Sequence, residues 1–103
     1  MLDDAEFSDA VQDAIKESGE LSFGAALAYL KQGKRVARRG WNGKGMWLLL
    51  VSTYGVSMEL TYGASTPRPE LRPWIGMKTA DNSFVPWLAS QTDILAEDWA
   101  VIG

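Results

Sequence analysis

The spacing of apolar residues changes along the chain, and each change predicts a different element. Between residues 22 and 33, apolar side chains recur every three or four positions, which predicts the main helix. Ser22 is suited to cap the start of this helix, and Gly33 stands where a helix-ending glycine belongs. A weaker repeat of the same kind after Ser8 predicts a short amphipathic helix that Gly19 ends.

Short apolar runs after the main helix predict strands. They lie at residues 36–37, 46–51, 74–79, 83–87 and 99–102. The pair Asp81-Asn82 predicts a hairpin turn between the third and fourth runs, and Ser90 followed by Asp93 predicts a short helix. Residues 52–73 form a long connection with one more candidate edge strand at 56–62. The fold class is therefore α+β: a small antiparallel sheet of four to five short strands, one main N-terminal helix and a short C-terminal helix.

Length and composition limit the chain to one domain. It has 103 residues, of which 47% are hydrophobic and 22% charged, as in an ordinary globular protein. Residues 1–20 carry seven carboxylates against the single base Lys16, so they are expected to form an acidic N-terminal extension. Residues 21–103 are expected to form a single ligand-binding domain. Since there is no apolar leader and no long apolar run, the expected location is the cytoplasm.

Two missing residue types exclude most catalytic chemistry. Without cysteine there is no thiolate nucleophile and no zinc–thiolate site, and without histidine the commonest general base and metal ligand is missing. The chain is therefore expected not to be an enzyme and to hold no metal or cofactor. The adjacent pair Glu97-Asp98 is expected to be solvated surface.

Charge is distributed unevenly along an acidic chain. The net charge is −3, which disfavours binding to nucleic acid or other long polyanions. Residues 31–44 nevertheless hold six basic residues and no acidic one. Such a stretch suits a small anion, although a solvated basic face explains the charge equally well.

The first candidate binding stretch is the glycine-rich loop at residues 38–45. Its glycines allow close approach of the backbone to a phosphate, and Arg39 stands beside them. Trp41 offers a flat surface for a purine, and Asn42 offers a donor and an acceptor to a base edge. The structural alternative is a turn with Trp41 in the core.

The second candidate stretch runs from residue 85 to residue 93. Trp87 is followed there by four polar residues able to contact a base or sugar: Ser90, Gln91, Thr92 and Asp93. The structural alternative is helix capping by Ser90 and Asp93 with Trp87 in the core. Trp74, next to Pro73, is interpreted as a core residue first.

Several motifs together resemble a known family. They are SFGAAL at 22–27, GKRVAR at 33–38, GWNGKGM at 40–46, MKTAD at 77–81, VPWLASQTD at 85–93 and LAEDW at 95–99. The chain resembles, over about residues 21–102, a family of small phage and prophage proteins, the second family of Thoeris anti-defence proteins.

The resemblance implies a function and a set of site residues. Members of that family sequester a cyclic ADP-ribose isomer made by bacterial TIR-domain enzymes, and some also hold cyclic dinucleotides. They form homotetramers with ligand sites between protomers. By matching motifs, Trp41 and Trp87 would enclose the adenine, with Asn42, Ser90, Gln91, Thr92 and Asp93 as polar neighbours. Arg39 and Lys78 are added as candidates from their charge.

Three other functions stay open at this level. A protein–protein inhibitor would use the tryptophan-rich surface to block a host enzyme. An enzyme that hydrolyses a cyclic nucleotide would need a metal held by Asp81, Asp93 or Asp98. Single-stranded nucleic-acid binding is disfavoured by the acidic isoelectric point, near 4.8.

Overall fold

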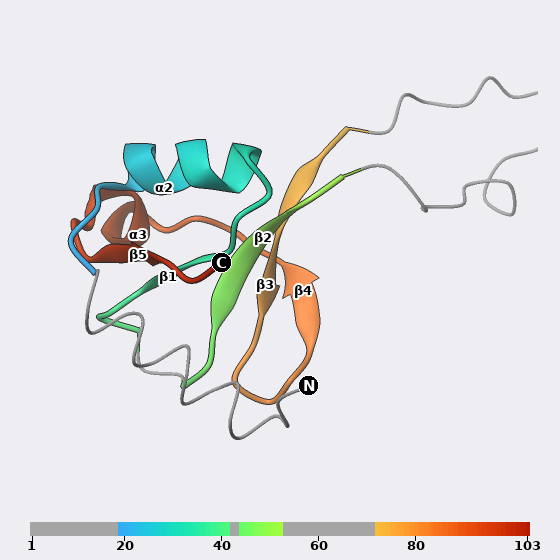
Figure 1. Cartoon of the computed structure of the whole chain (residues 1–103). Helices are drawn as coiled ribbons and strands as arrows, with labels where there is room; N and C mark the ends of the chain where they lie inside the picture. The colour runs from blue at the N-terminus through green and yellow to red at the C-terminus, as the bar shows by residue number, and fades with distance from the viewer. Residues whose placement is uncertain (1–18, 42–43, 53–71) are drawn as a thin grey trace, which may run out of the picture.

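A computed structural model describes residues 19–41, 44–52 and 72–103. These residues form two helices and a five-stranded sheet, in chain order α2 (Phe23–Lys31), β1 (Val36–Arg38), β2 (Trp47–Val51), β3 (Trp74–Lys78), β4 (Phe84–Pro86), α3 (Gln91–Leu95) and β5 (Trp99–Val101). The strand order is β4-β3-β2-β1-β5, and all four neighbouring pairs are antiparallel (Figure 1). The predicted α+β class is confirmed. The helix predicted after Ser8 and the edge strand predicted at 56–62 lie outside the described residues.

Helix α2 begins and ends at the residues that the sequence indicated. The Ser22 side chain accepts a hydrogen bond from the backbone N–H of Ala25, at 3.2 Å. At the other end Gly33 has a φ of 84°, which a residue with a side chain rarely adopts. The N–H groups of Gly33 and Lys34 donate to the carbonyls of Leu30 and Tyr29, so the last turn is closed by a Schellman motif.

Four of the five described strands are slightly shorter than predicted, and β1 is one residue longer, since it extends to Arg38. Met46 precedes the β2 ladder, which starts at Trp47 opposite Lys78. Strand β4 ends at Pro86, which has no N–H to donate and lies in an edge strand, where proline is tolerated. The predicted hairpin between β3 and β4 is confirmed, with Asn82 at a φ of 66° in its turn.

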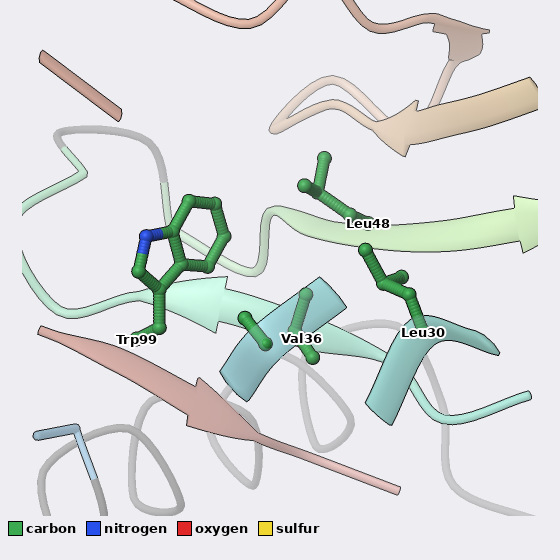
Figure 2. Packing of buried hydrophobic residues seen from close by; sticks show 5 residues of the cluster. Leu30, Val36, Leu48 and Trp99 are labelled. Atoms are coloured by element: carbon green, nitrogen blue, oxygen red, sulfur yellow. The ribbon is translucent and has the colours of Figure 1, made fainter. Parts of the chain in front are cut away.

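The core lies between α2 and one face of the sheet. Leu30 of α2 packs there against Val36, Leu48 and Trp99, and all four side chains are fully buried (Figure 2). They come from a helix and from three strands that are adjacent in the sheet but distant in sequence. This face is called the helical face below. Burial of these side chains is the main stabilising contribution that the described elements share.

The opposite face of the sheet carries aromatic side chains. Because side chains alternate along a strand, the neighbours of buried core residues point away from α2. This aromatic face includes Trp47, Trp74, Gly76, Lys78 and Phe84. It also includes Ala37 and Ala100, which are fully buried and packed against Trp41, Trp47 and Ile102. The expectation that Trp74 is a core residue is wrong, since it is 41% exposed. The reason is alternation: Ile75, the next residue, takes the core side.

Candidate functional site

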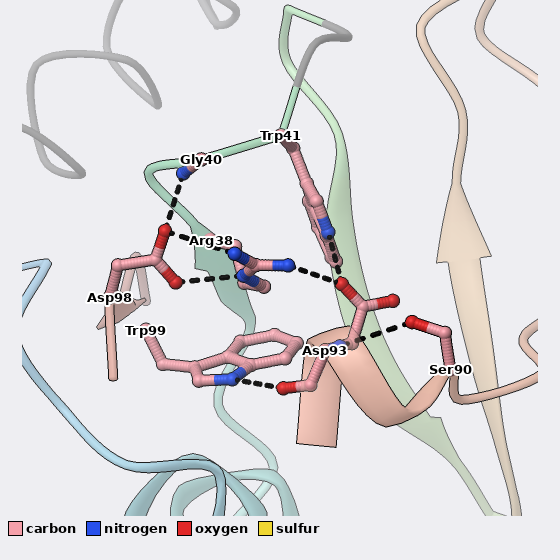
Figure 3. Close-up of polar contacts among 7 residues, drawn as sticks. All are labelled: Arg38, Gly40, Trp41, Ser90, Asp93, Asp98 and Trp99. Atoms are coloured by element: carbon pink, nitrogen blue, oxygen red, sulfur yellow. Dashed lines mark hydrogen bonds and ion pairs between the residues drawn. The ribbon is translucent and has the colours of Figure 1, made fainter. Parts of the chain in front are cut away.

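An arginine at the end of β1 is held by two carboxylates. Nε of Arg38 donates to Oδ1 of Asp98 at 2.7 Å, and Nη2 donates to Oδ2 of the same residue at 3.3 Å. Nη1 donates to Oδ1 of Asp93 at 2.6 Å (Figure 3). The three side chains are 13–20% exposed. A bidentate guanidinium–carboxylate pair in such a site is directional and rigid.

The sheet register brings these residues together across a long sequence separation. Arg38 pairs with Trp99 in the β1–β5 ladder, so Asp98 stands beside the end of β1. The chain turns directly after Arg38, and the backbone N–H of Gly40 donates to Oδ2 of Asp98 at 2.7 Å. A Cβ at Gly40 would lie 2.6 Å from that same oxygen, so the turn leaves no space for a side chain.

Asp93, on helix α3, joins further residues to the Arg38–Asp98 pair. The resulting cluster consists of Arg38, Gly40, Trp41, Ser90, Asp93, Asp98 and Trp99 (Figure 3). Its Oδ1 accepts the indole N–H of Trp41 at 3.0 Å as well as the Arg38 bond. Its backbone carbonyl accepts the indole N–H of Trp99 at 3.0 Å, and its backbone N–H donates to Oγ of Ser90. One residue therefore connects α3, the loop after β1 and the buried Trp99 of β5.

Two half-buried tryptophans pack against the same buried ring. Trp41 meets Trp99 at a centroid distance of 5.4 Å and an interplanar angle of 80°, and Trp87 meets it at 6.1 Å and 85°. Phe23 of α2 contacts both Trp87 and Trp99. Edge-to-face geometry of this kind is the favourable arrangement of aromatic pairs. Trp41 and Trp87 are thus fixed by the core while part of each ring stays at the surface.

The electrostatics keep the two carboxylates ionised. Burial acts to raise the pKa of Asp93, but hydrogen bonds from Trp41 and Arg38 outweigh it, and the pKa lies below the ordinary value. Burial likewise acts to raise the pKa of Asp98, and the bonds from Arg38 and the Gly40 backbone prevail. The hydrogen bond to Asp98 raises the pKa of Arg38. At neutral pH the cluster therefore holds two ionised carboxylates around one guanidinium.

The structure groups six of the nine candidate site residues. Trp41, Trp87, Ser90 and Asp93 are in or next to the Trp99 cluster, and Gln91 and Thr92 are exposed on the first turn of α3 beside it. Arg39 is exposed in the turn after β1. Lys78 stands apart, because it pairs with Trp47 and Phe84 and so belongs to the aromatic face. Asn42 lies outside the described residues.

The roles of two cluster members, Asp98 and Arg38, differ from those expected from the sequence. The expectation that Asp98 is solvated surface is wrong, because it accepts three hydrogen bonds from Arg38 and Gly40. Arg38 was part of a stretch interpreted as anion-binding, yet its guanidinium is occupied by internal carboxylates. The available signal was an acidic residue directly before the last apolar run and a basic one directly after an earlier run.

The described residues form neither a metal-binding cluster nor a membrane-spanning helix. Among residues 19–41, 44–52 and 72–103, no three acidic side chains come together as a metal site would require. Within the same ranges, no helix is long and apolar enough to cross a bilayer.

These observations define a small α+β domain with a rigid aromatic and ionic cluster at one end of its sheet. The model of the Thoeris anti-defense 2-like domain matches residues 21–102, and the chain belongs to this family. A protein of Bacillus phage SP01 named Thoeris anti-defense 2 is 45% identical over 85 residues. That match covers 81% of this chain and 96% of the phage protein, so the similarity extends over nearly all of the relative.

Proposed function

We propose that this protein is a phage anti-defence protein that binds a cyclic ADP-ribose-type signalling nucleotide and sequesters it without degrading it. Family membership supports the anti-defence role. The observation that carries the ligand class is the pair Trp41 and Trp87, two partly exposed indoles held edge-on against the buried Trp99. Rings fixed in this way lose little freedom when a base stacks on them, and such stacking contributes about 1–3 kcal/mol per base.

Polar groups for the rest of a nucleotide stand beside these rings. Gln91 and Thr92 are exposed on α3, and Arg39 is exposed in the turn that leads to Trp41. In this proposal the two side chains of α3 bind base or sugar edges, and Arg39 binds a phosphate by a charge-assisted hydrogen bond. Asp93 acts through Trp41, because its carboxylate already accepts the bonds of Trp41 and Arg38.

The state of the carboxylates favours sequestration over hydrolysis. A metal-dependent hydrolase would need Asp93 or Asp98 as a ligand or a base, but both carboxylates are paired with Arg38. Asp81 accepts hydrogen bonds in the β3–β4 turn, where Thr79 and Ser83 are its partners. A sequestering protein works by stoichiometry and therefore needs tight binding; nanomolar affinity corresponds to about −12 kcal/mol.

Assembly into a homotetramer in the cytoplasm of the infected host is part of the same proposal. Its structural support is a group of exposed apolar side chains around α3, Leu88, Ile94 and Leu95, which are 92%, 44% and 77% exposed. Apolar surface of this extent next to the Trp87 ring is typical of a protein contact. The second candidate function, inhibition of a host enzyme by direct contact, is favoured by the same three residues.

The binding test is isothermal titration of the purified protein with the TIR-derived cyclic ADP-ribose isomer, followed by heat denaturation and analysis of the released ligand. Binding with intact ligand recovered is the expected result. Trp87→Ala should weaken binding by about 5- to 150-fold, the loss of one stacked base. Trp74→Ala removes a tryptophan from the aromatic face and is the matched control, expected to bind as the unchanged protein does.

Two outcomes would contradict the proposal. Recovery of a hydrolysed nucleotide would make the protein an enzyme. Absence of binding, together with tight association of a host enzyme that Leu88→Ser and Leu95→Ser abolish, would establish the protein–protein inhibitor instead.

A further inference from the structure

The aromatic face of the sheet has a row of rings that no described helix covers. Trp47 and Trp74 each contact Phe84, at centroid distances of 6.2 and 6.1 Å, and Phe84 is 45% exposed. Helices α2 and α3 both lie on the other side of the sheet (Figure 1). Exposed rings gathered on one face of a sheet, here Trp74 at 41% and Phe84 at 45%, are typical of an interaction site.

The charge of the face indicates what would bind there. None of the strand residues of β1 to β5 is acidic. Lys78 stands in register with Trp47 and Phe84, and the guanidinium of Arg35 lies 5.2 Å from the centroid of the Trp47 ring. A complementary partner therefore presents apolar side chains together with carboxylates.

The N-terminal eighteen residues of this same chain have that composition. They contain six acidic residues and one basic residue, which leaves seven acidic and nine basic residues in 19–103. Four apolar residues, Phe7, Val11, Ala14 and Ile15, recur at the spacing of a single helix face. The family match begins at residue 21 and does not include this segment.

The point where the chain enters the fold is compatible with docking on this face. Leu21 pairs with Trp99 of the edge strand β5, so residue 19 lies at that edge of the sheet. A helix over residues 8–18 would be about 16 Å long. Three strand spacings, from β5 to β3, amount to about 14 Å, so such a helix spans the distance to Lys78.

We propose that residues 1–18 bind to the aromatic face as an amphipathic segment, with the apolar side on Trp47, Trp74 and Phe84 and the carboxylates toward Lys78. The proposed cover lies over Trp47, Trp74 and Phe84, whereas the rings of the proposed nucleotide site, Trp41 and Trp87, pack against Trp99 on the helical face. Trp41 also packs against Ala37 and Ala100 of the aromatic face, so the two sites are neighbours at the β1–β5 end of the sheet. The cover gives a role to residues 1–18, which precede the part of the chain that the family model matches.

The test is zero-length carbodiimide cross-linking of the full chain, which joins a carboxylate to a lysine only at contact distance, with mass-spectrometric identification of the linked peptides. We expect links from the acidic residues of 1–18 to Lys78, and few to Lys31 or Lys34 at the end of α2. A mixture of isotopically heavy and light protein separates links within one chain from links between two. High salt should reduce the yield, because part of the attraction is between charges.

Two double variants provide the comparison. Phe7→Ser with Val11→Ser removes the apolar side and should abolish the Lys78 links, while Ala10→Ser with Gln12→Ser changes other positions of the same segment and should keep them. Links that persist in the first variant, that favour Lys31 and Lys34, or that fail to form would overturn the proposal. Links found only between heavy and light chains would replace it with docking on a second copy.

Discussion

The two faces of the sheet hold their tryptophan side chains by different kinds of contact. On the helical face, the indole N–H groups of Trp41 and Trp99 are both bonded to Asp93, and Asp93 is bonded to Arg38. On the aromatic face, the indole nitrogen of Trp47 is buried without a hydrogen-bond partner, and its ring is held by contacts with Phe84 and Arg35. One face is fixed by directional polar bonds and the other by apolar contact.

Because the contacts differ, substitutions on the two faces are expected to differ in their cost to stability. A paired charge or a bonded indole leaves an unsatisfied partner behind when it is removed, which costs more than the bond itself contributes. Apolar contacts at a partly exposed surface can rearrange with small loss. Substitutions near Arg38 are therefore expected to be costly, and comparable substitutions near Phe84 mild.

The largest effect is expected from Arg38→Met. It leaves the carboxylates of Asp93 and Asp98 without their cation, and because the side chains are only 13–20% exposed, solvent compensates poorly. We expect a loss of about 3 kcal/mol in the free energy of unfolding, measured by urea denaturation. The matched control is Arg39→Met, the exposed neighbour, with a change within about 0.5 kcal/mol. Equal losses in both variants would show that the ion pair contributes nothing specific.

The second effect concerns the turn at Gly40. Gly40→Ala places a Cβ 2.6 Å from Oδ2 of Asp98, and that oxygen cannot retreat without losing its bonds to Arg38 and to the Gly40 N–H. We expect a loss of about 2 kcal/mol, measured in the same way. In an Asp98→Ala background most of this cost should disappear, because the clashing group is gone. A cost that is unchanged in that background would place the strain in the backbone.

Local elements of the fold could be predicted from the sequence, whereas the cluster could not. The boundaries of α2 follow from Ser22 and Gly33, because caps act on their own turn. The contact between Arg38 and Asp98 depends on β1 pairing with β5, and these residues are 60 positions apart. Periodicity indicates which side chains share a face but not which strands become neighbours.

The outcome for the tryptophans depends on local alternation as well as on packing. Trp74 was expected in the core from its place beside a proline, but the face that receives α2 takes Ile75 and Met77 instead. Trp74 shares its face of β3 with Gly76 and Lys78, whereas Ile75 and Met77 share the other face, so the alternation along this strand indicated the outcome and the interpretation from Pro73 did not use it. The sequence did single out Trp41 and Trp87, and the structure places both around Trp99.

A smaller effect is expected from pH. Because the pKa values of Asp93 and Asp98 are lowered in the folded protein, the unfolded chain binds protons first as the pH falls. Stability is then full above about pH 5 and decreases through about pH 4, the unfolded aspartate value, toward the lowered folded values. Thermal unfolding from neutral to acid pH measures this slope. Asp98→Asn should flatten it relative to Glu97→Gln, which removes the adjacent exposed carboxyl; equal slopes would mean that the ion pair is not linked to protons.

The smallest effect is expected where the geometric conflict is greatest, at Gly76 on the aromatic face. A Cβ there would lie 2.2 Å from Cζ of Phe84, closer than the conflict at Gly40. Phe84, however, is 45% exposed and has no polar bond that holds its ring, so the ring can shift among its apolar neighbours, the proposed N-terminal segment included. Gly76→Ala should therefore cost about 1 kcal/mol or less, roughly half the cost of Gly40→Ala.

If Gly76→Ala proves the more damaging of the two in urea denaturation, the Phe84 ring is held in place by more than its contacts with Trp47 and Trp74, and a covering segment is the candidate to examine. The double variant Gly76→Ala with Phe84→Ala decides this, since it removes the conflict together with the ring and should restore the stability of Phe84→Ala alone.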